Sequence, residues 1–146
     1  MLLKTHVIFG VAVGFLAMRL GAPPEASLAA AAVLSALINP AMDYLGHESG
    51  RRVPRTHEPI HAAALGAAVG ATAGLALGLH VAYCALAGAA VSLSHLLLDA
   101  FTEHGIYVRR GGRYRRFALA HLRYNDPAAN GLAAAISLLV LAAGLL

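Results

Sequence analysis

Charged residues and cysteine are scarce in this sequence of 146 residues. Only 12% of the residues are charged, whereas 59% are hydrophobic; an average soluble domain carries about 25% charged residues. This balance excludes intrinsic disorder, which requires low hydrophobicity and high charge, and it disfavours an ordinary soluble enzyme. The single cysteine, Cys84, excludes an intrachain disulfide and a cysteine-rich zinc site. The length corresponds to one domain.

Apolar stretches make up most of the chain. They cover residues 7–20, 26–42, 60–79, 81–98 and 128–146. A helix needs roughly 17–25 apolar residues to cross a bilayer, and all but the first stretch have that length. We therefore expect one all-α membrane domain, 1–146, of about five short transmembrane helices at about 6–20, 26–42, 58–79, 81–100 and 127–146, with loops at 43–57 and 101–126. Two alternatives stay open: a signal peptide in the first stretch, and a soluble bundle of buried alanine-rich helices.

Proline and glycine mark the ends of these helices. Proline is favoured in the first turn of a helix, as at Pro59 and Pro127. Pro40 is expected to disturb the last turn of the second helix. A tight turn at residues 78–80 predicts an antiparallel hairpin of the third and fourth helices. A stripe of glycines in the third helix would allow close helix packing, within the bundle or, as the alternative, in a homo-oligomer: Gly66, Gly70, Gly74 and Gly78.

A basic segment precedes the last helix. Residues 106–117 alternate β-forming residues and arginines around Gly111-Gly112, a pattern that predicts a two-residue β-hairpin. Its arginines would lie at the membrane surface, where they would contact anionic headgroups or bind a phosphate group. The sequence contains no motif for specific recognition of nucleic acid.

The charges are distributed unevenly along the predicted topology. With five crossings, ten of the eleven Lys and Arg residues fall on the side of the N-terminus, and Arg19 falls on the other. The positive-inside rule makes the N-terminal side cytoplasmic. Six of the seven acidic residues and seven of the eight histidines lie on or near the same side, with His80 as the exception.

Several histidines and aspartates on this side have the spacing of one helical turn. His95 and Asp99 are four residues apart at the end of an apolar helix, so they share a helix face. Asp43 and His47 are also four residues apart. An ionisable pair in a membrane segment is a candidate functional site. Imidazole and carboxylate ligands suit Zn, Fe, Mn or Ni, and zinc is common in hydrolytic sites. His6 and His57 lie in two further segments, so four segments bring His or Asp to the same membrane face.

These residues lie within motifs that resemble the YdjM-type membrane-bound metal-dependent hydrolases, and more closely an archaeal branch of uncharacterised members. The matching segments span most of the chain: residues 4–6, 43–48, 55–57, 94–99 with Thr102 and Gly105, and 125–127 with Asn130. The resemblance implies metal or catalytic roles for five residues, which are the candidate ligands: His6, Asp43, His57, His95 and Asp99. Arg52-Val53 stands where the bacterial pattern has a His-Arg pair, and Glu58 stands where it usually has serine.

We therefore expect a metal-dependent hydrolase at the cytoplasmic membrane interface. It would hold one or two divalent ions, with zinc favoured, and act on a phosphate-bearing or other anionic substrate such as a lipid headgroup. Candidates for proton transfer or ligand orientation are His47, Glu48, Glu58 and His121. Candidates for substrate binding are Arg55, Arg123 and Asn125. The alternative is a non-enzymatic oligomeric membrane protein with a structural His/Asp or metal-stapled network. A metal or proton carrier is disfavoured, because its polar groups would lie near the midplane.

Overall fold

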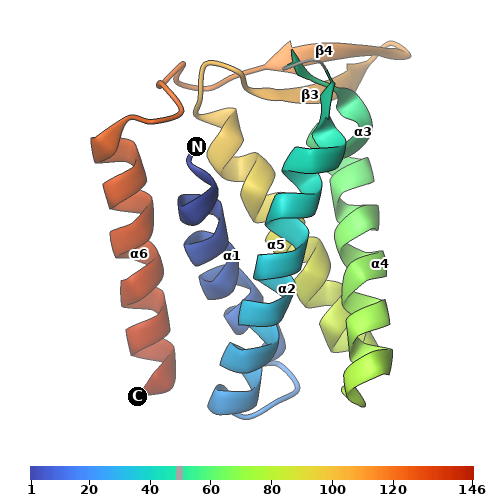
Figure 1. Ribbon diagram of the computed structural model, residues 1–146, viewed down its shortest axis with the longest axis vertical. Coiled ribbons are helices and arrows are strands. Elements are labelled where there is room, and N and C mark those ends of the chain that lie inside the picture. Colours follow the sequence, from blue (N-terminus) through green and yellow to red (C-terminus); the bar gives the residue numbers. More distant parts are fainter. Residues whose placement is uncertain (49–50) are drawn as a thin grey trace.

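The computed structural model describes residues 1–48 and 51–146, and it shows a bundle of upright helices with a β-hairpin across one end (Figure 1). The helices of this described part are α1 (Leu3–Met18), α2 (Pro24–Gly46), α3 (Pro54–His57), α4 (Pro59–Leu77), α5 (Val81–Ala100) and α6 (Pro127–Leu145). The strands are β1 (His47–Glu48), β2 (Arg51–Arg52), β3 (Ile106–Arg110) and β4 (Arg113–Phe117). The predicted all-α membrane bundle is confirmed.

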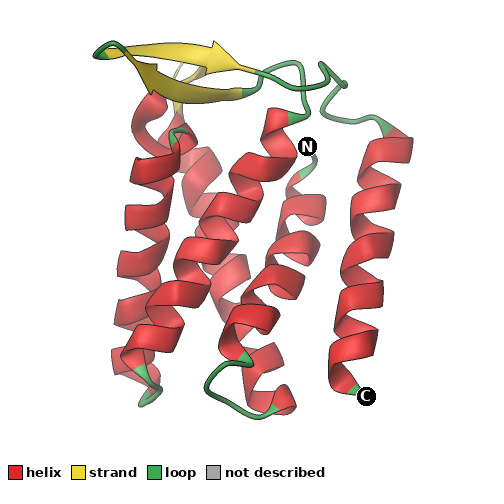
Figure 2. Ribbon diagram, turned by 180° about the vertical axis from the view of Figure 1, so that it is seen from behind, coloured by secondary structure: helices red, strands yellow, loops and turns green. Residues whose placement is uncertain are grey.

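Four of these helices, α2, α4, α5 and α6, are long and apolar enough to cross a membrane. The 16 residues of α1 extend about 24 Å at 1.5 Å per residue, which is less than the roughly 30 Å of a hydrocarbon core. The N-terminus lies at the same end of the bundle as β3 and β4, and the C-terminus lies at the opposite end (Figures 1 and 2).

The polar end of α2 differs from the prediction. The helix was expected to be disturbed at Pro40 and to end near residue 42, but it continues through Pro40 to Gly46. Proline removes only one N–H from the helical ladder, and the flanking Ile38, Asn39 and Met42 are fully buried, so packing holds the helix together. As a result Asp43 lies on a helix rather than in a loop. The rest of the expected loop contains the short pairing of β1 with β2 and the single turn of α3.

The predicted hairpin of α4 and α5 is confirmed, with Gly78 in the left-handed conformation (φ 65°) at the end of α4. The glycine stripe lets these two helices pack closely. A Cβ atom on Gly66 or Gly70 would collide with backbone atoms of Gly88 or Cys84 on α5. This stripe therefore serves packing within the chain.

The basic β-hairpin is also confirmed. β3 and β4 pair antiparallel from Ile106↔Phe117 to Arg110↔Arg113. Gly111 and Gly112 both have positive φ, 58° and 75°, as a type I′ turn requires. The hairpin lies across the same end of the bundle as the N-terminus (Figure 2), where β3 contacts α3 and α5. Its five arginines are exposed.

Candidate metal centre

A cluster of histidine and aspartate side chains lies beneath the β-hairpin. It is built where the last turns of α2 and α5 meet α3 and the first turns of α1. Asp99 is fully buried at its centre, as are His57 and His95, and His6 is 1% exposed. The structure brings together all five predicted ligands: His6, Asp43, His57, His95 and Asp99.

Asp99 is the residue that the others surround. Its Oδ1 atom lies 3.2 Å from Nε2 of His6. Its Oδ2 atom lies 3.3 Å from Nε2 of His95 and 3.5 Å from Nε2 of His57. Nε2 of His95 also lies 3.5 Å from Oδ1 of Asp43. Residues from four helices thus place nitrogen and oxygen atoms around one small volume.

The protonation of the His95 ring follows from its neighbours. The amide nitrogen of Asn39 donates hydrogen bonds to the carbonyl and the hydroxyl oxygen of Ser35, so the Asn39 oxygen is an acceptor. That oxygen lies 2.9 Å from Nδ1 of His95, and Nδ1 therefore carries the proton. In the neutral ring Nε2 then has a free lone pair, and it faces Asp99 and Asp43.

His57 is oriented in the same way by a different residue. The hydroxyl of Thr56 donates its only proton to the carbonyl of Met42, so the hydroxyl oxygen accepts from Nδ1 of His57 at 3.1 Å. Nε2 of His57 therefore also has a free lone pair directed at Asp99. Burial lowers the pKa of His57, which keeps the ring neutral at pH 7. Gly46 permits this contact, since a Cβ there would collide with Thr56 and His57.

With both rings neutral, three acceptor atoms point at one another. Nε2 of His57, Nε2 of His95 and Oδ2 of Asp99 are buried and make no hydrogen bond. Buried polar atoms are normally satisfied, and acceptors at 3.3–3.5 Å repel one another unless a cation lies between them. Ligands about 2.0–2.1 Å from a tetrahedral zinc ion are about 3.3–3.4 Å apart. The donor atoms therefore have the chemistry and the spacing of a metal site.

The described residues contain two groups that could hold a metal ion: His6 with His95 and Asp99, and Asp43 with His47 and His57. The His6 and His95 rings stack with their centroids 3.9 Å apart, and His47 lies edge-on to His57. The two groups adjoin through Asp43 and His95. This arrangement has enough donors for one or two ions.

Arg52 is a member of the site that we did not predict. Its guanidinium contacts Oδ1 of Asp99 at 2.8 Å and donates to the carbonyl of Gly105 at 2.7 Å. The hydroxyl of Tyr107 in turn donates to the Arg52 carbonyl. The amino group of Met1 also lies 2.8 Å from Asp99 Oδ1. One feature of the sequence could have identified Arg52. It stands where the pattern of the YdjM-type hydrolases, which the chain resembles, has a different residue.

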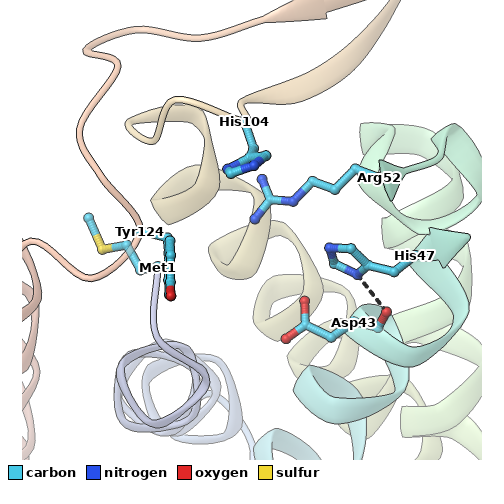
Figure 3. Close-up of a pocket in the computed structure, with 6 residues that line it drawn as sticks. All are labelled: Met1, Asp43, His47, Arg52, His104 and Tyr124. Atoms are coloured by element: carbon cyan, nitrogen blue, oxygen red, sulfur yellow. Dashed lines mark hydrogen bonds between the residues drawn. The ribbon is translucent and has the colours of Figure 1, made fainter. Parts of the chain in front are cut away.

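A polar pocket of about 350 Å³ opens above the cluster. Figure 3 shows the Asp43 carboxylate and the Arg52 guanidinium pointing into it, with Met1 and Tyr124 on the opposite wall. His104 and His47 complete the lining. The His47 ring donates from Nδ1 to the Asp43 carbonyl, 2.7 Å away, so its Nε2 is available to accept a proton.

The other predicted site residues lie farther from the cluster, and their roles stay predictions. Glu58 is buried and caps α4 by accepting from the backbone N–H of His61. Arg55 is exposed and pairs with Glu48 at 3.7 Å. The remaining three predicted residues lie in the segment between β4 and α6 and are exposed: His121, Arg123 and Asn125.

Comparisons with protein-family models, curated proteins and solved structures find no match. The fold and the cluster therefore define the class of protein: an all-α membrane bundle with groups of His and Asp residues that could hold a metal ion.

Proposed function

We propose that this protein is a membrane-embedded, metal-dependent hydrolase. One observation carries the proposal: two histidine Nε2 atoms and one aspartate oxygen, all buried and without hydrogen-bond partners, converge beside an open polar pocket. A divalent ion there would lower the pKa of a bound water to about 7 and polarise the bond to be cleaved. The resemblance to the YdjM-type hydrolases supports the same activity.

Zinc is the ion that we favour. The donor set consists of imidazole nitrogens and carboxylate oxygens, which zinc accepts in tetrahedral geometry. Asn39 and Thr56 hydrogen-bond the outer nitrogens of His95 and His57, as residues behind zinc-binding histidines commonly do. Such partners fix the ring orientation and increase the basicity of the coordinating nitrogen.

A phosphoester is the substrate class that we propose. Arg52 presents a planar guanidinium to the pocket, a group that binds phosphate oxygens in a bidentate manner. His47 lines the same pocket and would accept a proton at Nε2 from the attacking water. The exposed arginines of β3 and β4 add positive charge at this end. By the positive-inside rule, we propose that this end faces the cytoplasm.

The first test is metal content. Protein purified in detergent would be analysed by inductively coupled plasma mass spectrometry as wild type, His95→Ala, Asp99→Ala and, as the control, His80→Ala, since His80 is exposed at the opposite end of the bundle. We expect bound zinc in the wild type and the control only. If the wild type binds no divalent metal, either as purified or after incubation with zinc, manganese or iron, the proposal fails.

A structural, non-catalytic metal site is the second candidate, because the candidate ligands come from α1, α2, α3 and α5. Ions held by the two groups would together cross-link all four helices. Both candidates predict that chelation lowers the melting temperature. Only the hydrolase predicts that metal-loaded wild type, but not Asp99→Ala, cleaves p-nitrophenyl phosphate or dioleoyl phosphatidate. Metal binding without cleavage of any phosphoester would favour the structural role.

A further inference from the structure

An apolar groove lies between α1, α5 and α6, next to the cluster of histidine and aspartate side chains. It has a volume of about 290 Å³, and every residue that lines it has an apolar side chain. Phe9 contributes from α1, Leu97 and Leu98 from α5, and Ala129 and Ile136 from α6. The stretch from Ala129 to Ile136 corresponds to about 10 Å of helix. The groove therefore runs along two turns of α6.

The position of α6 explains the groove. Figure 1 shows α6 at the edge of the bundle with α1 beside it, and its extensive contacts are with α1 rather than α5. At the upper end, Leu122 closes the groove. This residue is held by two backbone hydrogen bonds: its N–H donates to Phe101, and its carbonyl accepts from Glu103. These two hydrogen bonds thus fix the position of Leu122 in the wall of the groove.

The groove and the polar pocket share a wall. Met1 lines both, and its amino group contacts Asp99. Leu98, which lines the groove, is the neighbour of Asp99 in the chain. An elongated molecule can therefore place an apolar chain in the groove and a polar end in the pocket. The groove lies along the membrane-spanning helices α5 and α6, so its apolar surface faces the hydrocarbon region.

We infer that the substrate is a membrane lipid with a phosphate-bearing headgroup, and that one of its hydrocarbon chains binds in the groove between α1, α5 and α6. The inference rests on the proposed hydrolase and specifies its substrate. The paired chemistry supports it: the apolar groove shares the lining residue Met1 with a pocket that contains Arg52, His47 and His104. A soluble phosphoester would use the pocket alone. A lipid would enter the groove from within the bilayer, parallel to the membrane plane.

The test fills the groove and measures lipid binding separately from catalysis. Ala129 is half-buried in the groove, whereas Ala135 is exposed on the same helix. Wild type, Ala129→Phe and the control Ala135→Phe would be mixed in detergent with dioleoyl phosphatidate, and the bound lipid would be counted by native mass spectrometry. We expect Ala129→Phe to bind about tenfold less lipid, the equivalent of about 1.4 kcal/mol, and the control to match the wild type. Equal binding by all three overturns the inference.

A second measurement does not depend on a folded variant. Phosphatidate with a diazirine in its acyl chain would be photolysed with the wild-type protein, and the labelled peptides would be identified. We expect labels on residues 97–101 and 129–136. Labels spread over all the outer helix faces overturn the inference.

The native mass spectra of the first test also report the oligomeric state. A wild-type dimer that Ala129→Phe converts to a monomer overturns the inference, because the groove would then hold a second copy of the chain.

Turnover separates the two proposals. If phosphatidate binds in the groove but no metal supports its cleavage, the hydrolase proposal fails and the lipid site stands. If glycerol 3-phosphate is cleaved as fast as phosphatidate, and Ala129→Phe leaves both rates unchanged, the hydrolase stands and the lipid inference fails. Cleavage of phosphatidate that Ala129→Phe reduces about tenfold, with glycerol 3-phosphate unaffected, supports both.

Discussion

His95 donates a hydrogen bond from Nδ1 to the side-chain oxygen of Asn39, across the interface of α5 and α2. This contact at 2.9 Å determines which nitrogen of His95 faces Asp43 and Asp99. Asn39 is itself held by Ser35, whose hydroxyl donates to the carbonyl of Val7 on α1. A chain of buried hydrogen bonds through three helices thus orients one candidate ligand.

Replacement of Asn39 by leucine is expected to weaken metal binding without removing a ligand. The ring of His95 would lose its Nδ1 partner and with it a defined orientation, and loss of such a partner typically reduces metal affinity by about 10–100-fold. Competition with a zinc-sensitive dye would measure the change. Ser137→Ala is the matched control, because Ser137 is equally buried but bonds only within α6. Equal affinity in the two variants would contradict the assigned role.

Gly46→Ala is expected to displace His57, one of the candidate ligands. The added Cβ would collide with the Thr56 hydroxyl and the His57 ring, so α3 must move away from α2. We expect lower zinc content and a destabilisation of about 1–3 kcal/mol, the usual cost of overpacking, visible as a lower melting temperature. Gly131→Ala places the same methyl group on α6 with nothing within 4 Å. Its zinc content should match that of the wild type.

Arg52→Gln is expected to destabilise the metal-free protein. Asp99 is fully buried and would lose a cation 2.8 Å away; removing one member of a buried ion pair typically costs about 3–5 kcal/mol. Added zinc should restore part of the lost stability, because it supplies positive charge to the same carboxylate. Thermal unfolding with and without zinc measures both effects. Arg51→Gln, which removes an exposed side chain, should change little; a similar loss in both would refute the argument.

The stability of the metal-free protein is expected to fall as the pH is lowered below about 6.5. Burial holds the pKa of His57 below its ordinary value, so in this range the unfolded chain binds a proton that the folded chain does not. Stability is therefore retained above the ordinary pKa and lost as the pH falls toward the lowered one. Unfolding measured at pH 8 and pH 5.5 should show this slope, and His57→Gln should flatten it. An unchanged slope in the variant would show that other groups carry the dependence.

The proximity of the candidate ligands was predictable in part because their signals are local. His95 and Asp99 lie one turn apart on one helix, and the Gly111-Gly112 turn specifies its own hairpin. The residues that orient the ligands were not predictable, because their roles depend on contacts between distant segments: Asn39 and His95 are 56 residues apart. For the segment that contains Asn39, the sequence predicted only a disturbance of the helix at Pro40, and the buried packing of α2 overrides that disturbance.

α6 supplies none of the five candidate ligands. It is attached near its first turn by Asn130, which accepts hydrogen bonds from the Thr5 hydroxyl and the backbone of Leu2. Below this point its contacts with α1 are mainly apolar. In the proposed lipid hydrolase, metal coordination and binding of the hydrocarbon chain would therefore be carried by separate parts of the molecule. Substitutions along α6 would then change which hydrocarbon chain binds and leave the metal ligands around Asp99 unchanged.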